Sequence, residues 1–238
     1  MDEFTYYNIF ETKGIEYLAI ITFFLLLVPF WFMLNRRAKV NRQAKGSLSG
    51  LSPYAINVPQ GIFFSKNHTW TYLEKSGLAK IGLDGMLLHL TGDITVHQIK
   101  KPGERISKGE VIAEIQNSGK YLKVLSPVSG EFISSNKQVV EAPEIMTEDT
   151  YEGGWLCKVK PFDWVADTNS YYLAENATEW SKSELQRFKD FLTSRIGKYS
   201  AEPQPVILQD GGELRHHVLS KLPVDVWNDF QQNFMAID

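Results

Sequence analysis

The sequence contains a single cysteine and has little net charge. Its 238 residues carry a formal net charge of -3 at pH 7, so no basic field favours nucleic acid, and we expect no nucleic-acid partner. Cys157 cannot form an intramolecular disulfide, and its apolar neighbours Leu156 and Val159 indicate a strand in which the thiol packs as a small hydrophobic group. The sequence shows no Ser-His-Asp or Cys-His arrangement, so we expect the protein not to be an enzyme.

Several polar motifs are too incomplete to indicate a site. His216 and His217 are adjacent, so in an extended segment they point to opposite faces, and no cysteine or carboxylate spacing completes a metal site around them. Residues 210–213 (DGGE) lack the lysine and hydroxyl of a phosphate-binding loop and indicate a tight turn. His89 and His97 have no partner that the sequence identifies. We therefore expect no metal site.

One stretch departs from the soluble pattern. Residues 17–34 (YLAIITFFLLLVPFWFML) contain no charge, and with Ile15 they approach the ~20 apolar residues that span a bilayer as a helix. Acidic residues before the stretch and bulky residues at its end argue against a cleaved signal peptide. Basic residues follow at once, and such flanks stay on the cytoplasmic side: Arg36, Arg37, Lys39, Arg42 and Lys45. We expect a single-pass helix over residues 15–34 in the cytoplasmic (inner) membrane, with residues 1–14 outside and the C-terminal domain in the cytoplasm.

The rest of the chain divides into three parts. Residues 35–57 pass from basic to Gly/Ser-rich and predict a juxtamembrane linker. Residues 58–161 consist of short alternating runs separated by Pro-Gly, Lys-Gly and Ser-Gly turns, which indicates a small, mainly β barrel or sandwich. Within it, residues 86–90 (MLLHL) predict a helical turn over one end of the barrel.

Residues 162–238 predict a helical C-terminal extension. Residues 181–196 have apolar side chains at helical spacing, with Ser181 and Glu184 as a candidate capping box and Gly197 as the stop. Residues 224–235 (VDVWNDFQQNFM) place Val226, Phe230 and Phe234 on one helical face beside Trp227. Neither helix can bury its apolar face alone. We expect them to pack on the β domain, on each other or on a partner.

Six segments between residues 62 and 161 resemble, in order, the H protein of the glycine cleavage system. They read SKNHTWTYLE, GLAKIGLDGM, LTGDITVHQI, PGERISKGEVIAEI, SPVSGEF and APEIMTEDTYEGGWLCKVKP. The resemblance implies a lipoyl-type barrel-sandwich hybrid. It also implies that a lysine on a hairpin turn carries lipoate, which shuttles an aminomethyl group among the other subunits of that system.

The lysine of the family is missing from its usual position. In the family it lies seven residues before the Ser-Pro of the following turn, which is Ser126-Pro127 here, and counting back gives Gly119. Its neighbour Lys120 is displaced by one residue, a shift that reverses the face in a strand. Gly119 suits a tight turn with positive φ. We expect Lys120 to be a solvated lysine beside the turn and to carry no cofactor; a lipoate attached to Lys120 is the alternative.

Two further departures from the family pattern replace acidic residues with uncharged ones. In the family, these positions resemble contacts for the amine that the lipoyl arm carries. The acidic residue at the head of the turn is Gln116 here, and the carboxylate between the histidine and tryptophan of a His-Glu-Trp motif is replaced by Thr69. His68 and Trp70 alternate with Thr69 and are expected to share a strand face. A cationic intermediate would lose charge-assisted hydrogen bonds at both places.

The leading hypothesis is a non-catalytic accessory or scaffold subunit. It presents a degenerate H-protein-like domain at the cytoplasmic membrane face, within a membrane-bound redox or electron-transfer complex of membrane-embedded and cytoplasmic subunits. The alternative is a membrane-tethered lipoyl carrier modified at Lys120. A third hypothesis, an efflux adaptor, is less attractive because such adaptors split the lipoyl halves around a coiled coil and face outward.

Overall fold

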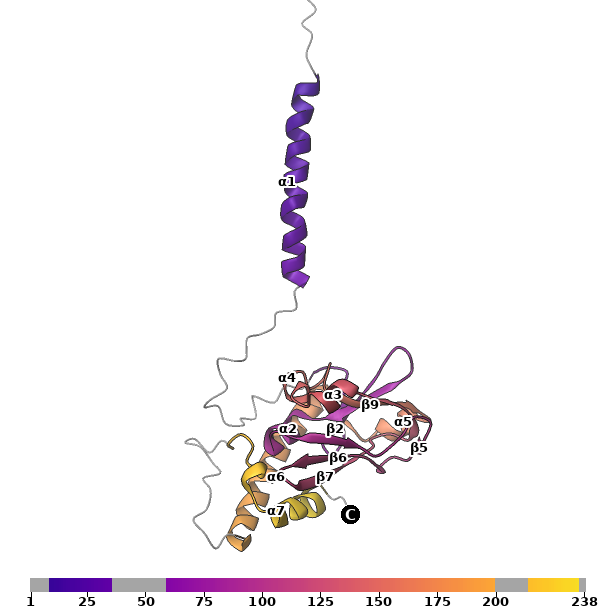
Figure 1. Ribbon diagram of the computed structural model, residues 1–238, viewed down its shortest axis with the longest axis vertical. Helices are drawn as coiled ribbons and strands as arrows, with labels where there is room; N and C mark the ends of the chain where they lie inside the picture. The colour runs from indigo at the N-terminus through magenta and orange to yellow at the C-terminus, as the bar shows by residue number, and fades with distance from the viewer. Residues whose placement is uncertain (1–8, 36–58, 200–213, 236–238) are drawn as a thin grey trace, which may run out of the picture. The chain divides into compact units, whose positions relative to one another are not determined.

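The computed structural model describes residues 9–35, 59–199 and 214–235. It divides the chain into two units, Met1–Leu48 and Ser49–Asp238, which are described separately. The predicted linker at residues 35–57 lies, apart from Asn35, outside the described residues, and so does the predicted turn at residues 210–213. Figure 1 shows the elements with the labels used below.

The described part of the first unit is the helix α1 (Ile9–Asn35), with Pro29 inside it. The helix begins at Ile9, before the expected start at Ile15, because Glu11 and Lys13 are residue types that favour a helix almost as well as apolar ones. The apolar side chains that the structure describes along α1 are exposed. Among the described residues, no helix meets the length and apolarity needed to cross a membrane.

The second unit is built on two antiparallel sheets. The larger is seven-stranded in the order β10-β1-β2-β3-β9-β8-β5, and the smaller is three-stranded in the order β4-β6-β7. The strands are β1 (Phe63–Phe64), β2 (Thr69–Leu73), β3 (Ala79–Leu83), β4 (Thr95–Gln98), β5 (Arg105–Ile106), β6 (Val111–Asn117), β7 (Lys120–Leu125), β8 (Gly130–Ser135), β9 (Trp155–Pro161) and β10 (Tyr172–Leu173). The mainly β architecture expected from the turn-rich pattern is confirmed.

Both sheets contribute to one hydrophobic core. Ile81 of β3 and Phe132 of β8 come from the larger sheet, and Ile112 and Ile115 of β6 from the smaller one. Alternation of side chains is clearest in β7, whose burial pattern alternates along the strand, whereas β6 has a register shift between Val111 and Ala113. A second cluster forms around Trp70 of β2. A Cβ at Gly82 would lie 2.5 Å from Cε2 of Trp70, so only glycine lets the indole lie this close to β3.

Four short helices connect the strands: α2 (Gly85–Thr91), α3 (Lys137–Glu141), α4 (Ile145–Glu148) and α5 (Trp164–Thr168). The carboxylate of Asp84 caps α2 by accepting a hydrogen bond of 2.7 Å from the Leu87 amide, and Gly92 ends the helix with φ 75°. Met86, Leu87, Leu88 and Leu90 are buried. The helical turn expected at residues 86–90 is therefore confirmed.

The extension begins with the long helix α6 (Ala174–Tyr199). It starts at Ala174 and runs past Gly197, so the predictions of a capping box at Ser181 and a stop at Gly197 were wrong. Residues 174–180 contain alanine and glutamate, which favour a helix, and Ser181 lies inside it with its side chain buried. Leu185, Phe188 and Leu192 are buried as the periodicity predicted.

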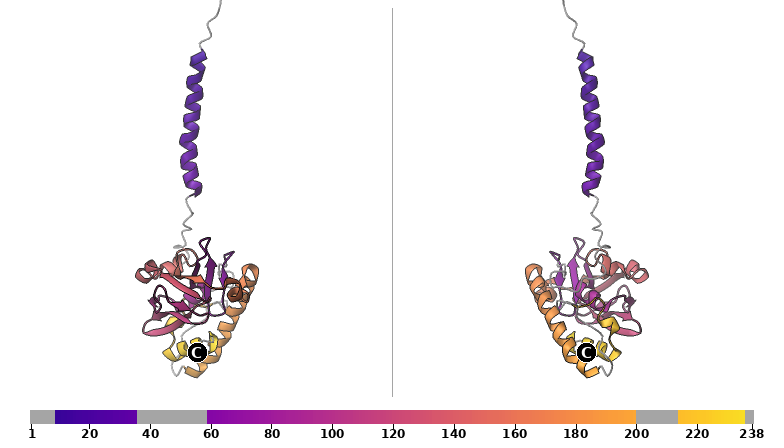
Figure 2. Two further views of the ribbon diagram at one scale, coloured as in Figure 1. Left: turned by 90° about the vertical axis from the view of Figure 1, so that its right-hand side faces the viewer. Right: turned by 90° about the vertical axis from the view of Figure 1, so that its left-hand side faces the viewer.

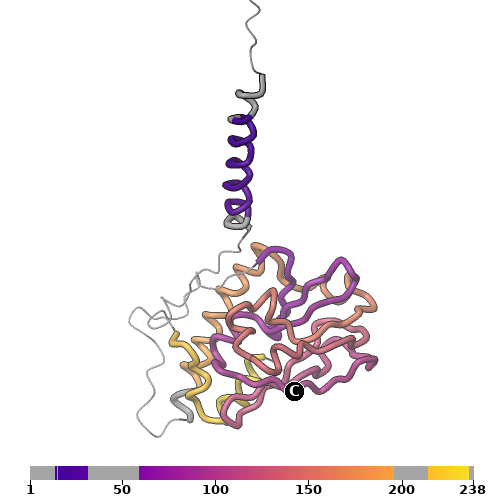
Figure 3. Tube along the Cα trace, turned by 45° about the horizontal axis from the view of Figure 1, so that its top comes forward, coloured from indigo at the N-terminus to yellow at the C-terminus, as the bar shows by residue number. Residues whose placement is uncertain are grey.

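The last described residues, 214–235, are called the C-terminal segment. It contains η2 (Leu219–Lys221), α7 (Val224–Asp229) and a π-helical turn, η3 (Phe230–Phe234). Figures 2 and 3 show it in yellow beside α6, along one side of the β domain. The rings of Phe230 and Phe234 stack at 4.9 Å, and Phe188 of α6 meets both edge-on. The extension therefore packs on itself and on the β domain.

Candidate functional site

The β6–β7 hairpin is the place where the family resemblance puts the cofactor. Asn117 pairs with Lys120 across the hairpin, leaving Ser118 and Gly119 as a two-residue turn with φ of 50° and 80°. Positive φ at both positions is typical of a type I′ turn, so the tight turn expected at Gly119 is confirmed. Asn117 Nδ2 donates to the carbonyl oxygens of Thr91 (3.1 Å) and Asp93 (2.6 Å). These bonds hold the turn end of the hairpin against the end of α2.

Lys120 is buried, with 8% of its surface exposed. Its Nζ donates to the carbonyl oxygens of Ser220 (2.6 Å) and Leu222 (3.0 Å) and lies 5.2 Å from the centroid of the Trp227 ring. Burial lowers the pKa of the amine from its usual value, because the charged form loses water. The expectation of a solvated lysine was wrong. The C-terminal segment covers the amine and supplies both of its acceptors.

The same segment covers the strand that Lys120 begins. The amide of Lys123 in β7 donates to Oε1 of Gln231 at 2.9 Å. Within the segment, Nε1 of Trp227 donates to the carbonyl oxygen of Leu219 at 2.7 Å, so the indole that lies beside Lys120 is itself held in place. Val226, Trp227 and Phe230 are buried. The apolar residues at helical spacing in residues 224–235 are thus the side chains that the fold buries.

The segment ends at the His68-Thr69-Trp70 motif. His68 precedes β2 in a left-handed conformation (φ 58°), and its Nδ1 lies 2.8 Å from Oδ2 of Asp84. Its ring lies between those of Phe234 and Trp180, with centroids at 5.7 and 5.5 Å. Asn67 Nδ2 donates to the carbonyl oxygen of Met235 at 3.0 Å. One segment therefore covers both the hairpin lysine and this motif.

Thr69 and Gln116, the positions where the family resemblance implies carboxylates, make hydrogen bonds to uncharged groups. Oγ1 of Thr69 is buried 2.7 Å from Oγ of Ser65. The side chain of Gln116 bonds Nε2 of His97 through its Oε1 at 3.0 Å on the exposed face of the small sheet. His97 thus has a partner that the sequence did not identify. Neither position offers a negative charge to a cationic ligand.

A histidine group connects α2 with the start of the C-terminal segment. The ring centroids of His89 and His216 are 3.8 Å apart, and those of His216 and His217 are 6.1 Å apart. His89 therefore has a partner, His216, that the sequence did not identify because the two residues are far apart in the chain. Within the described part of the chain, no group of three or more His, Cys, Asp or Glu side chains could hold a metal ion.

Cys157 lies in β9 and is completely buried. Burial raises the pKa of its thiol to about 12, because the thiolate would lack solvation. The thiol packs among the core residues that include Ile81 and Leu156. Its place in a strand and its hydrophobic packing agree with the prediction from its neighbours.

Comparison with known proteins identifies the family. The glycine cleavage H-protein family model matches residues 62–184, which is more than half of the chain. The chain belongs to the glycine cleavage H-protein family. The resemblance seen over residues 62–161 is thereby confirmed, and it extends into the first part of α6.

The relatives match most of their own length. A probable glycine cleavage system H protein of Pyrococcus abyssi is 31% identical over 126 residues, covering 53% of this chain and 93% of that protein. The glycine cleavage system H protein of Streptomyces avermitilis is 30% identical over 125 residues, covering 52% of this chain and 98% of that protein. A crystal structure of a glycine cleavage system H protein from Mycobacterium marinum aligns with a TM-score of 0.44 at 22% identity, covering 53% of this chain and 98% of that chain.

The C-terminal segment lies beyond the residues that the family model matches. The site therefore combines two parts: a hairpin inside the matched region, and a cover outside it. Sequence reasoning identified the hairpin from its spacing but missed the cover, because Lys120 is 100 and 102 positions away from the carbonyls that bind it. The apolar periodicity of residues 224–235 was the available signal, and it gives no indication of which surface the helix buries.

Proposed function

We propose that this H-protein-family chain is a non-catalytic accessory or scaffold subunit. In this role its H-like domain is a protein-binding module that carries no lipoate. The observation that supports the proposal is the state of Lys120, whose amine is buried and donates to the carbonyls of Ser220 and Leu222. The hairpin tip itself is Gly119, which has no side chain to modify.

A lipoyl arm needs an exposed amine. Acylation of Lys120 would remove its positive charge, leave one N–H donor for the two carbonyl acceptors and require space where Trp227 now lies. A hydrogen bond from a charged donor is worth about 1.5–3 kcal/mol, so the modification would work against the packing of the whole C-terminal segment. A domain that keeps the fold of a lipoyl carrier without the lipoyl group is best explained by a role in binding other proteins, because function resides in the site and not in the fold.

The proposal places the protein in the cytoplasmic membrane with its N-terminus outside. Residues 17–34 carry no charge and lie within the helix α1, and the basic residues that follow favour a cytoplasmic position for the H-like domain. The same basic residues would attract anionic lipid head groups. A freely diffusing carrier would need no such anchor.

The proposed partners are membrane-embedded and cytoplasmic subunits of a redox or electron-transfer complex. The chain shows no cofactor motif of its own, so the chemistry of such a complex would come from the other subunits. The H-like domain would then supply a surface that positions them at the membrane.

The alternative is a membrane-tethered lipoyl carrier modified at Lys120. The intact β6–β7 hairpin favours it, because Lys120 lies directly beside the turn that carries the cofactor in the family. In that case the C-terminal segment would have to move away before the lysine could be modified.

Crosslinking in native membranes tests the scaffold proposal. The full chain, tagged at its N-terminus, is crosslinked, solubilised and isolated, and the proteins that accompany it are quantified by mass spectrometry. A chain of residues 1–57 alone serves as control for membrane neighbours. We expect the full chain, and not the control, to enrich a cofactor-carrying membrane subunit. Isolation of the full chain alone, or the same proteins from both, would contradict the proposal.

A further inference from the structure

The C-terminal segment is attached to α2 by a pair of imidazoles. His89 lies in α2, and its Nε2 is buried without a hydrogen-bond partner among the described residues. The ring of His216 packs against it with a centroid distance of 3.8 Å. Neutral imidazoles can pack in this way, but a positive charge on the His89 ring would be placed in a poorly solvated contact with the ring of His216.

The histidine contact and the covering of Lys120 belong to one short piece of chain. The amide of His217 donates to the carbonyl oxygen of His89 at 3.0 Å. The carbonyl oxygen of His217 in turn accepts from Oγ of Ser220 at 2.6 Å, and Ser220 supplies one of the two acceptors of Lys120. A movement of residues 216–217 away from α2 would therefore remove an acceptor from the lysine.

Few other charges surround the His89 ring. The other titratable groups that act on it are the imidazoles of His216 and His217. Of the elements packed against α2, α4 carries Glu148 and η2 carries Lys221, and both of these side chains are exposed. Within α2 itself, His89 is the single titratable residue of the sequence GMLLHLT. A proton on His89 would thus find no buried carboxylate among these groups.

We propose that His89 and His216 form a proton-sensitive latch, whose protonation releases the C-terminal segment and uncovers Lys120 and the hairpin for a partner protein. The inference rests on the proposed role of the segment as a cover in a scaffold subunit. It adds that the covered face is presented only when the latch opens. The latch does not depend on whether the uncovered lysine later receives a group.

The expected size of the effect follows from the imidazole. Burial, together with His216 and His217, lowers the pKa of His89 from 6.5 to about 3. The closed form therefore binds fewer protons than the open form between these values, so the contribution of His89 to closure is fully present above pH 6.5 and is lost as the pH falls toward 3. With an open-state pKa of 6.5, the ratio of open to closed protein at pH 5 is about 30-fold higher than at pH 8.

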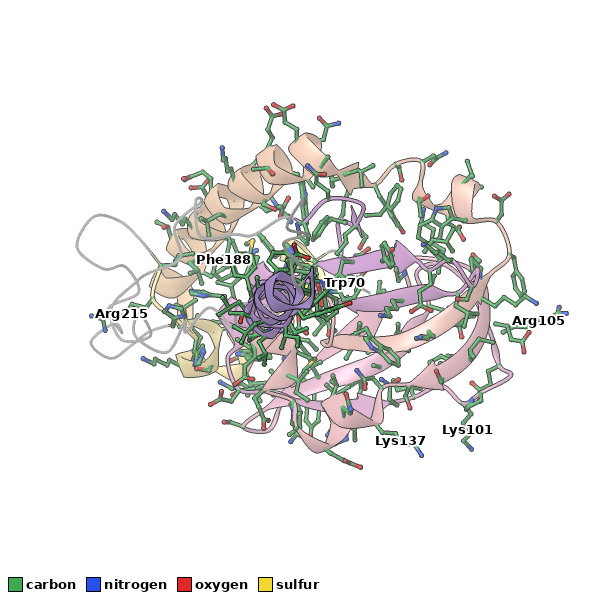
Figure 4. The ribbon with its side chains drawn as sticks, turned by 90° about the horizontal axis from the view of Figure 1, so that it is seen from above. Trp70, Lys101, Arg105, Lys137, Phe188 and Arg215 are labelled. Atoms are coloured by element: carbon green, nitrogen blue, oxygen red, sulfur yellow. The ribbon has the colours of Figure 1, made fainter. Side chains whose placement is uncertain are left out.

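Pulse labelling of amines in the full chain, held in nanodiscs, measures the opening. An N-hydroxysuccinimide acetate pulse is applied at pH 8 and pH 5, and the labelling of Lys120 is divided by that of Lys101. Lys101 is exposed and extends away from the domain (Figure 4), so the ratio removes the effect of pH on the reactivity of an exposed amine. We expect this ratio to rise by up to about 30-fold at pH 5.

Two substitutions decide whether the histidines cause the rise. His89→Gln removes the buried imidazole and His216→Gln removes the ring that packs against it, so each should flatten the pH dependence, whereas the control His97→Gln, on the exposed face of the small sheet, should leave it intact. His216 is exposed, so its substitution spares the core, and protection of the Cys157 thiol reports that each variant is folded.

A ratio that stays constant between pH 8 and pH 5 would overturn the latch, as would an undiminished rise in a folded His216→Gln variant. Either result would leave the scaffold proposal standing, because that proposal fails on different data, namely a lipoyl group on Lys120 or the absence of partners. A failure of the scaffold proposal would equally leave a measured latch intact.

Discussion

Replacement of Lys120 by methionine should loosen the C-terminal segment. The substitution keeps an unbranched side chain of similar length but removes the ammonium that donates to the carbonyls of Ser220 and Leu222. Two such hydrogen bonds are worth about 1.5–3 kcal/mol each, or about 3–6 kcal/mol together. Relief from burying a cation offsets part of this. We expect the free energy of opening of the segment to fall by about 2–3 kcal/mol.

Hydrogen exchange followed by mass spectrometry measures this change. A fall of 2–3 kcal/mol corresponds to an acceleration of about 30- to 150-fold for amides that exchange when the segment opens, such as those of Leu222 and Met235. The matched control is Lys101→Met, which changes an exposed lysine in the same way. If Lys120→Met accelerated exchange of the segment no more than Lys101→Met, the ammonium would not hold the cover, and the account of the site would be refuted.

Three further predictions concern the hairpin, the cover and the core. Gly119→Lys places an amine at the exposed turn tip, where no atom lies within 4 Å of a new Cβ. The positive φ makes this substitution cost about 1–2 kcal/mol of backbone energy. Residue 119 should gain a lipoyl group when a lipoyl ligase is co-expressed, which peptide mass analysis checks. Phe230→Ala in the buried aromatic cluster should lower the free energy of unfolding by about 3–5 kcal/mol, whereas Phe162→Ala, 61% exposed, should change it by less than about 1 kcal/mol in the same urea titration. Because the pKa of Cys157 is raised to about 12, its thiol should resist a disulfide reagent at pH 8 in the folded protein and react once urea is added.

Much of the β domain could be predicted from the sequence, because local patterns determine it. The Ser-Gly turn demands positive φ at the hairpin tip, and the structure gives φ of 50° and 80° there. The apolar run at residues 86–90 forms a buried helix because Asp84 caps it and Gly92 ends it. These features depend on residues that are neighbours in the chain, which sequence patterns report well.

The burial of Lys120 could not be predicted in the same way. Its acceptors are backbone carbonyls, which every residue possesses, so no sequence motif distinguishes Ser220 and Leu222. The contact of His89 with His216 is likewise a tertiary one between α2 and the C-terminal segment. The predicted helix began at residue 181, whereas α6 begins at Ala174. Residues 174–180 lack the apolar periodicity that identified residues 181–196 as a helix.

The most direct test of the account is the mass of the peptide that contains Lys120. The protein is isolated from the cells that produce it, and residues 116–123 are analysed beside the lipoyl proteins of the same cells, which serve as the positive control for modification. An unmodified Lys120 in cells whose other lipoyl proteins are fully modified is the predicted result. A lipoyl mass increment on Lys120 would contradict the account and identify the protein as a lipoyl carrier.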